Sequence, residues 1–198
     1  GGAGTVGLGL KDGRAEAARP HLFSRQRELF AQPQFAVAVI DTPSDQQSGM
    51  AEVFRQSANH VADMEAVARE LRGRFPKARL VLMAHSRGTV SAGYVARALG
   101  DQVGATVLFS GRYHVTLRAP DAPPGGPGGS GLSGIDLGSL KSSVLLVHHA
   151  KDACAATPFA QAEAARARAG RPRGDREAAA SGARRQARDL DALEAGGS

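Results

Sequence analysis

The chain has 198 residues, of which 42% are hydrophobic, and it carries a formal net charge of +6 at pH 7. This length suits one domain with a single core. We expect no membrane partner, because no apolar run approaches the ~18 residues that a membrane span needs. We also expect no nucleic-acid partner, because the basic residues are scattered among acidic ones and no basic cluster is interleaved with aromatics.

The chain begins on a glycine-rich segment, residues 1–9, without a methionine, and we expect that the natural N-terminus is missing. Gly2, Gly4 and Gly7 have the spacing of a dinucleotide-binding fingerprint, which needs a strand before it and a helix opening within it. Asp41 could then hold a ribose hydroxyl, although it lies beyond the usual ~20 residues from the glycines. A loop that holds an anion with its backbone N–H groups, or a flexible terminus, remain as alternatives.

Strands and helices alternate along the rest of the chain. In chain order we expect a helix over 22–32, a strand over 35–40, a helix over 51–75, a strand over 80–83, a helix over 88–100, strands over 105–111 and 143–149, and a helix from 158. The strands are short, apolar and rich in β-branched residues, as in parallel sheets that helices cover on both faces. Without hairpins, this order predicts an α/β fold with a mostly parallel sheet flanked by helices.

Finer expectations accompany some of these elements. In the helix over 22–32 we expect Phe23, Leu29 and Phe30 to face inward. The last helix should begin with Thr157 as N-cap and Pro158 in its first turn.

Two segments differ in composition from the rest. Residues 118–138 are rich in proline and glycine with almost nothing to bury, which predicts a mobile loop inside a domain that spans 1–169. Residues 170–198 form a tail of alanine, arginine and glycine with few large apolar residues, which predicts a disordered or marginally helical segment.

The central motif is Ala84-His85-Ser86-Arg87-Gly88, which stands between an apolar strand pattern and a helical pattern. Strand, sharp turn around a serine, and helix are the context that a nucleophile elbow requires. Small residues at positions 84 and 88 leave room for the tight turn, although Ala84 replaces the usual first glycine. The alternative is that Ser86 only caps the helix after a buried strand.

In this order of parts the chain resembles the α/β-hydrolase family, over about residues 1–165. The resemblance implies that Ser86 is the nucleophile and Asp152, after the strand over 143–149, the triad acid. It also implies oxyanion donors at the N–H of Arg87 and at Gly2 or Ala3. The reaction would be acyl transfer on an ester or similar bond of a small-molecule substrate, without a metal or cofactor.

The chain departs from the family pattern because none of its six histidines follows Asp152. Without a base to take the serine proton, activity should be severely reduced. His114, on a loop at the same edge of the sheet, is the best substitute base, and of His148 and His149 one should point inward. A catalytically silent binding or scaffold protein, and a dinucleotide-dependent oxidoreductase, therefore stay open. Substrate specificity and oligomeric state are not readable, and a cytoplasmic location is a default.

Overall fold

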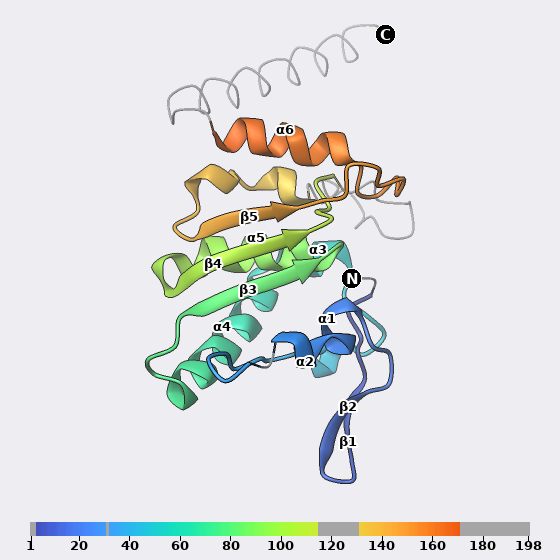
Figure 1. Ribbon diagram of the computed structural model, residues 1–198, viewed down its shortest axis with the longest axis vertical. Coiled ribbons are helices and arrows are strands. Elements are labelled where there is room, and N and C mark those ends of the chain that lie inside the picture. Colours follow the sequence, from blue (N-terminus) through green and yellow to red (C-terminus); the bar gives the residue numbers. More distant parts are fainter. Residues whose placement is uncertain (1–2, 31, 115–130, 171–198) are drawn as a thin grey trace, which may run out of the picture.

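The computed structural model describes residues 3–30, 32–114 and 131–170. Its centre is a parallel sheet with strand order β3-β4-β5 (Leu80–His85, Val103–Phe109 and Ser143–Val147). Helices α5 (Gly88–Leu99) and α4 (Ala58–Arg74) lie behind this sheet, and α6 (Phe159–Ala169) lies beyond β5 (Figure 1). The expectation of an α/β arrangement with helices against a parallel sheet is therefore confirmed for a small, three-stranded sheet.

The remaining elements are shorter. They are β1 (Leu8–Lys11), β2 (Arg14–Ala17), α1 (Leu22–Arg25), α2 (Arg27–Phe30), α3 (Glu52–Arg55), and the 3-10 turns η1 (Ser44–Gln46), η2 (Gly100–Gln102), η4 (Gly131–Gly134) and η5 (Leu137–Ser139). None of the helices within the described ranges combines the length and apolar character needed to cross a membrane.

The core lies between the sheet and α5. Val90 and Leu108 are almost fully buried in it, because the apolar side of α5 faces the strands. Gly93 of α5 permits a close approach of η4, since a Cβ there would lie 2.7 Å from Cδ2 of Leu132. The segment 118–138 was expected to bury almost nothing, and this is wrong for its C-terminal part, where Leu132, Ile135 and Leu137 join the core. Residues 115–130, like residues 171–198 of the tail expected over 170–198, lie outside the described residues.

The N-terminal glycines lead into a hairpin. Strands β1 and β2 pair antiparallel across a turn at Asp12 and Gly13, whose φ values of 51° and 75° are typical of a type I′ turn. Our expectation of a fold without hairpins was wrong, and Asp12-Gly13 was the signal that could have shown it. A dinucleotide fingerprint opens a helix, whereas residues 8–11 form a strand here, so the structure removes the main support for that alternative.

The apolar run 35–40 forms no strand. Phe35, Val37 and Ile40 are exposed, and no ladder hydrogen bonds join this run to β3. High β propensity reflects packing on a pleated surface, and a run without a pairing edge has no such surface. The prediction of a buried strand here was therefore wrong.

Two predicted helices are broken into pieces. The helix over 22–32 becomes α1 and α2, with Phe23 against the ring of Phe30, while Leu29 is exposed rather than inward. The helix over 51–75 becomes α3 and α4, because the Ser57 side chain accepts a hydrogen bond from the N–H of His60 and starts a new helix.

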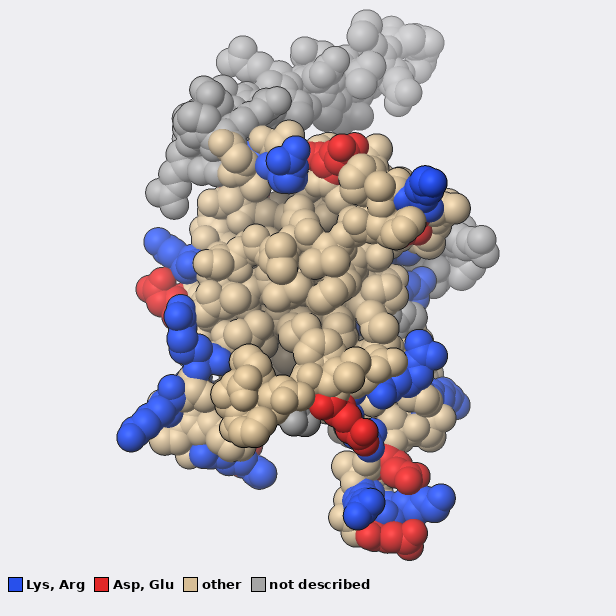
Figure 2. Space-filling view, in the orientation of Figure 1, with Lys and Arg blue, Asp and Glu red and all other residues tan. Residues whose placement is uncertain are grey.

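The sheet surface opposite α5 is apolar. Its exposed side chains include Val81 and Met83 of β3 and Leu145 and Val147 of β5. Figure 2 shows this side with the charged residues gathered at the rim and uncharged atoms over the centre. Among the described residues, helices thus cover chiefly one face of the sheet, and the expected burial of both faces is not found.

Asp41 anchors the segment that precedes the hairpin. Its Oδ1 accepts hydrogen bonds from the N–H groups of Val6 (2.7 Å) and Thr42 (2.8 Å), and its Oδ2 accepts one from Leu8 (2.8 Å). Partial burial would raise the pKa of Asp41, but the hydrogen bonds from Leu8 and Val6 lower it overall. Both carboxylate oxygens therefore accept hydrogen bonds from backbone N–H groups, so Asp41 is poorly placed to bind a ribose hydroxyl.

Replacing Asp41 with asparagine should lower the free energy of unfolding by about 1 kcal/mol at pH 7, after allowance for the solvent exposure of the site. Because the folded pKa is lowered, this stabilisation is present above the ordinary carboxyl pKa and is lost as pH falls through the folded value. Urea unfolding of both proteins between pH 7 and pH 2 measures the difference. A gap between them that stays constant down to pH 2 would contradict this role.

Candidate active site

Ser86 lies at a sharp turn between β3 and α5. Its N–H continues the sheet ladder by donating to the carbonyl of Phe109 at 3.0 Å, and then its φ of 54° reverses the chain into α5. Such a φ costs a non-glycine residue of the order of 1–3 kcal/mol, and strain of this kind gathers at functional sites. The predicted strand, turn and helix around Ser86 are thus present.

A second serine has the same conformation on the neighbouring strand. Ser110 follows β4, its N–H donates to the carbonyl of Val147 at 2.9 Å, and its φ is 44°. Since His85 and Phe109 are register partners, Ser86 and Ser110 lie side by side at the carboxyl ends of β3 and β4. This edge is where ligands bind in open α/β sheets.

The N-terminus of α5 offers an unoccupied donor. Within the described part of the chain no hydrogen bond uses the backbone N–H of Arg87, which precedes a helix of 12 residues. Free N–H groups at a helix start favour negative charge. Ala3, the other described oxyanion candidate, has its carbonyl bonded to the N–H of Met50 at 2.8 Å, and Gly2 lies outside the described residues.

Thr89 holds the turn together. Its hydroxyl donates to the carbonyl of Ser86 at 2.6 Å and accepts from the N–H of Arg112 at 3.1 Å. The residue is fully buried, and both bonds are partly buried. Thr89 therefore joins the loop that follows β4 to the turn that carries Ser86.

Asp152 follows β5, as expected, but its carboxylate is engaged locally. Its Oδ1 accepts from the N–H of Cys154 at 2.9 Å, and its Oδ2 lies 3.1 Å from both the hydroxyl of Thr157 and Nε2 of His148. The N–H of Cys154 lowers the pKa of Asp152, burial opposes this, and Thr157 and His148 lower the pKa further. Thr157 was predicted to cap α6, but its hydroxyl bonds to Asp152 instead, and Pro158 occupies the cap position without a side-chain bond.

His148 is the imidazole that pairs with Asp152. Its Nε2 lies 2.8 Å from the carbonyl of Thr157, which can only accept, so Nε2 carries the proton. The other ring nitrogen, Nδ1, is buried without a hydrogen-bond partner among the described residues. His148 thus points inward, as expected of one of the two histidines, and closes the loop 148–157.

The predicted substitute base contacts another residue. Nε2 of His114 lies 3.4 Å from the hydroxyl of Ser133, and within the described ranges no imidazole is hydrogen-bonded to Ser86. His85 precedes the serine, and His21 is near enough to His85 to influence it electrostatically. Burial is the main cause that lowers the pKa of each of these two, which keeps both imidazoles uncharged near neutral pH.

An ionic cluster borders the turn, and the sequence analysis missed it. Oε1 of Glu52 lies 3.1 Å from Nε of Arg87 and 2.8 Å from Nε of Arg112. Arg55, buried beside them, donates to the hydroxyl of Ser91 at 3.1 Å. Glu52 and Arg55 lie in α3, whereas Arg87 and Arg112 follow β3 and β4, so no pattern within one segment predicted that these side chains meet.

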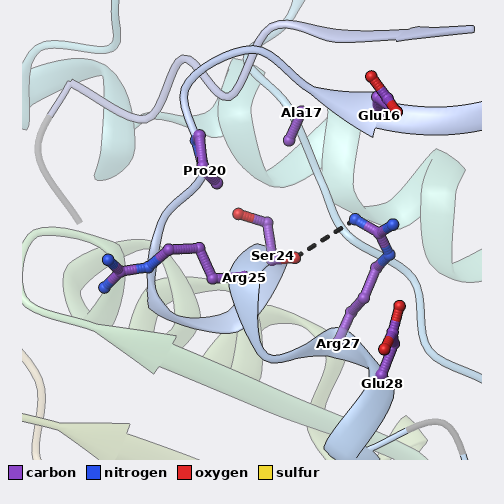
Figure 3. Close-up of a pocket in the computed structure, with 7 residues that line it drawn as sticks. All are labelled: Glu16, Ala17, Pro20, Ser24, Arg25, Arg27 and Glu28. Atoms are coloured by element: carbon purple, nitrogen blue, oxygen red, sulfur yellow. Dashed lines mark hydrogen bonds between the residues drawn. The ribbon is translucent and has the colours of Figure 1, made fainter. Parts of the chain in front are cut away.

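A hollow lies away from Ser86. A pocket of about 330 Å³ between β2 and the α1–α2 segment is lined by Glu16, Ser24 and Arg27, among others (Figure 3). Arg27 reaches the carbonyl of Ser24 across it at 3.5 Å. Neither Ser86 nor Asp152 lines this pocket, and it is open and polar, so we do not assign it the chemistry.

Comparison of the chain with protein-family models, with curated proteins and with solved structures finds no match. Within the described ranges, no group of three histidine, cysteine, aspartate or glutamate side chains is gathered as a metal site would need.

Proposed function

We propose that the protein is a serine hydrolase of the α/β-hydrolase type that accepts an acyl group from a small ester or related substrate at Ser86. The observation that carries this proposal is the φ of 54° at Ser86, between the parallel strand β3 and the helix α5. A serine held at positive φ between a strand and a helix is typical of a nucleophile elbow.

In the proposed reaction the Ser86 oxygen attacks the substrate carbonyl and the hydroxyl proton passes to a base. The N–H of Arg87 hydrogen-bonds the oxyanion that develops, which is the main electrostatic contribution to such reactions. Collapse of the tetrahedral adduct expels the alcohol, which takes up a proton, and leaves an acyl-serine for water to hydrolyse.

The base is the weak part of this arrangement. His148 is committed to Thr157 and Asp152, and His114 contacts Ser133. We therefore expect Ser86 to react with strongly activated acyl or phosphonyl compounds and to turn over ordinary esters slowly, since both half-reactions need proton transfer.

Labelling with a fluorophosphonate probe tests the proposal. We expect the folded protein to be modified at Ser86, with labelling abolished in Ser86→Ala and retained in Ser110→Ala. Ser110 is the matched control because it is also a serine with positive φ at the same edge of the sheet. Peptide mapping identifies the modified residue, and equal labelling of wild type and Ser86→Ala would refute the assignment.

A silent binding protein of the same architecture is the second candidate. It is favoured by the local engagement of Asp152 and by the lack of an imidazole hydrogen-bonded to Ser86 among the described residues. A folded protein that binds small acyl compounds but does not react with the probe would support this candidate over the enzyme.

A further inference from the structure

Within the described part of the chain, two arginines pair with one glutamate beside Ser86. The side chain of Glu52 is 5% exposed and is the carboxylate that pairs with Arg87 and Arg112, while Arg55 lies buried near the same group. Burial lowers the pKa of Arg55, Glu52 raises it in part, and Arg87 lowers it further, so the two guanidinium groups are close enough to repel each other. Among the described residues, the guanidinium groups of Arg87 and Arg112 thus share the carboxylate of Glu52.

The ion pairs use only part of each guanidinium. Both contacts to Glu52 are made by an Nε atom. The charges are close, but the contacts lack hydrogen-bond geometry, because Oε1 of Glu52 and Nε of Arg112 have no hydrogen-bond partner among the described residues. A buried excess of charge is costly unless a counter-charge satisfies it.

The cluster adjoins the proposed nucleophile. Arg87 is the residue after Ser86, and its side chain is 39% exposed, which leaves it accessible to a solute. Arg112 is 14% exposed, and its backbone N–H is bonded through Thr89 to the Ser86 turn. Both arginines therefore stand at the carboxyl edge where an acyl substrate would approach.

We propose that Arg87 and Arg112, oriented by Glu52, bind an anionic group of the substrate, so that the preferred acyl compounds carry a carboxylate. Planar guanidinium groups match the two oxygens of a carboxylate better than a lysine would. That the bound anion is part of a substrate rests on the proposed function, but binding of an anion by these arginines does not depend on the reactivity of Ser86.

Calorimetric titration with the dicarboxylates succinate and adipate tests the site, with 1,6-hexanediol as an uncharged ligand of adipate's length. We expect at least one dicarboxylate to bind and the diol not to bind. Affinity should fall about tenfold or more in Arg87→Gln and in Arg112→Gln, because each removes a charge-assisted contact. Arg97→Gln is the matched control, since it removes an exposed arginine that lies over Tyr94 on the same helix.

Arg112→Lys is a milder variant that is less disruptive to the fold than Arg112→Gln. It keeps the positive charge and removes only the planar guanidinium group, and it should bind dicarboxylates more weakly than wild type. All titrations are repeated in Ser86→Ala, where binding should persist. Dicarboxylate binding without fluorophosphonate labelling would support the anion site and refute the hydrolase proposal. Labelling of Ser86 without dicarboxylate binding, or equal affinity in wild type and both glutamine variants, overturns the anion site alone.

Discussion

Replacing Glu52 with glutamine is expected to lower the free energy of unfolding by about 3 kcal/mol. Glu52 is the buried carboxylate that pairs with both Arg87 and Arg112, and its replacement by a neutral amide removes the negative charge from both ion pairs. Removing one partner of a buried pair typically costs about 3–5 kcal/mol. We place the effect at the lower end because Arg87 is partly solvated.

Urea unfolding of wild type, Glu52→Gln and Glu70→Gln measures this effect. Glu70 is the matched control: it pairs with Arg74 at 2.7 Å, but both side chains are about two-thirds exposed, and such pairs contribute at most about 1 kcal/mol. Succinate should restore part of the stability of Glu52→Gln by binding the folded state. Equal stability of the two variants would show that the Glu52 cluster is not electrostatically coupled.

Replacing Thr89 with valine should cost about 2 kcal/mol of stability and slow fluorophosphonate labelling of Ser86 about tenfold or more. The substitution keeps the shape of the side chain but deletes the hydroxyl that bonds both Ser86 and Arg112. Leaving the partly buried N–H of Arg112 without its acceptor costs about 1–3 kcal/mol. A turn that is no longer held in place also misorients the nucleophile, and small misplacements cost large factors in rate.

Thr89→Ser distinguishes the hydroxyl from the packing. It retains both hydrogen bonds and loses one methyl group, which should cost about 1 kcal/mol, while labelling stays near the wild-type rate. Thermal unfolding and time courses of labelling provide the two measurements. If Ser86 is labelled as fast in Thr89→Val as in Thr89→Ser, the Thr89 hydroxyl does not position the turn.

The elements that the sequence predicted well have patterns confined to a few neighbouring residues. β3, α5, β4 and β5 each follow from a short apolar strand pattern or a helical spacing, and each lies near its expected place. The turn at Ser86 follows from small residues around a serine at a strand-to-helix junction. Asp12-Gly13 carried an equally local signal for the β1–β2 hairpin, which the analysis overlooked.

The errors share a different cause. The run 35–40 has the composition of a strand, but pairing needs a second strand at the correct edge, which a pattern within one segment cannot supply. Thr157 and Pro158 have the order of a helix start, yet the hydroxyl of Thr157 bonds to Asp152 instead. For residues 35–40 the lack of a pairing strand outweighed the local preference, and for Thr157 the hydrogen bond to Asp152 did so.

The local chain therefore accounts for the strand, strained turn and helix that present Ser86, because backbone preferences and small flanking residues act within one short segment. The choice of partners came from the tertiary fold. It set Glu52 between Arg87 and Arg112, and it joined Arg112 to the Ser86 turn through Thr89. Such contacts depend on which distant segments are packed together, and a charged or hydroxyl side chain has no sequence pattern that specifies its partner.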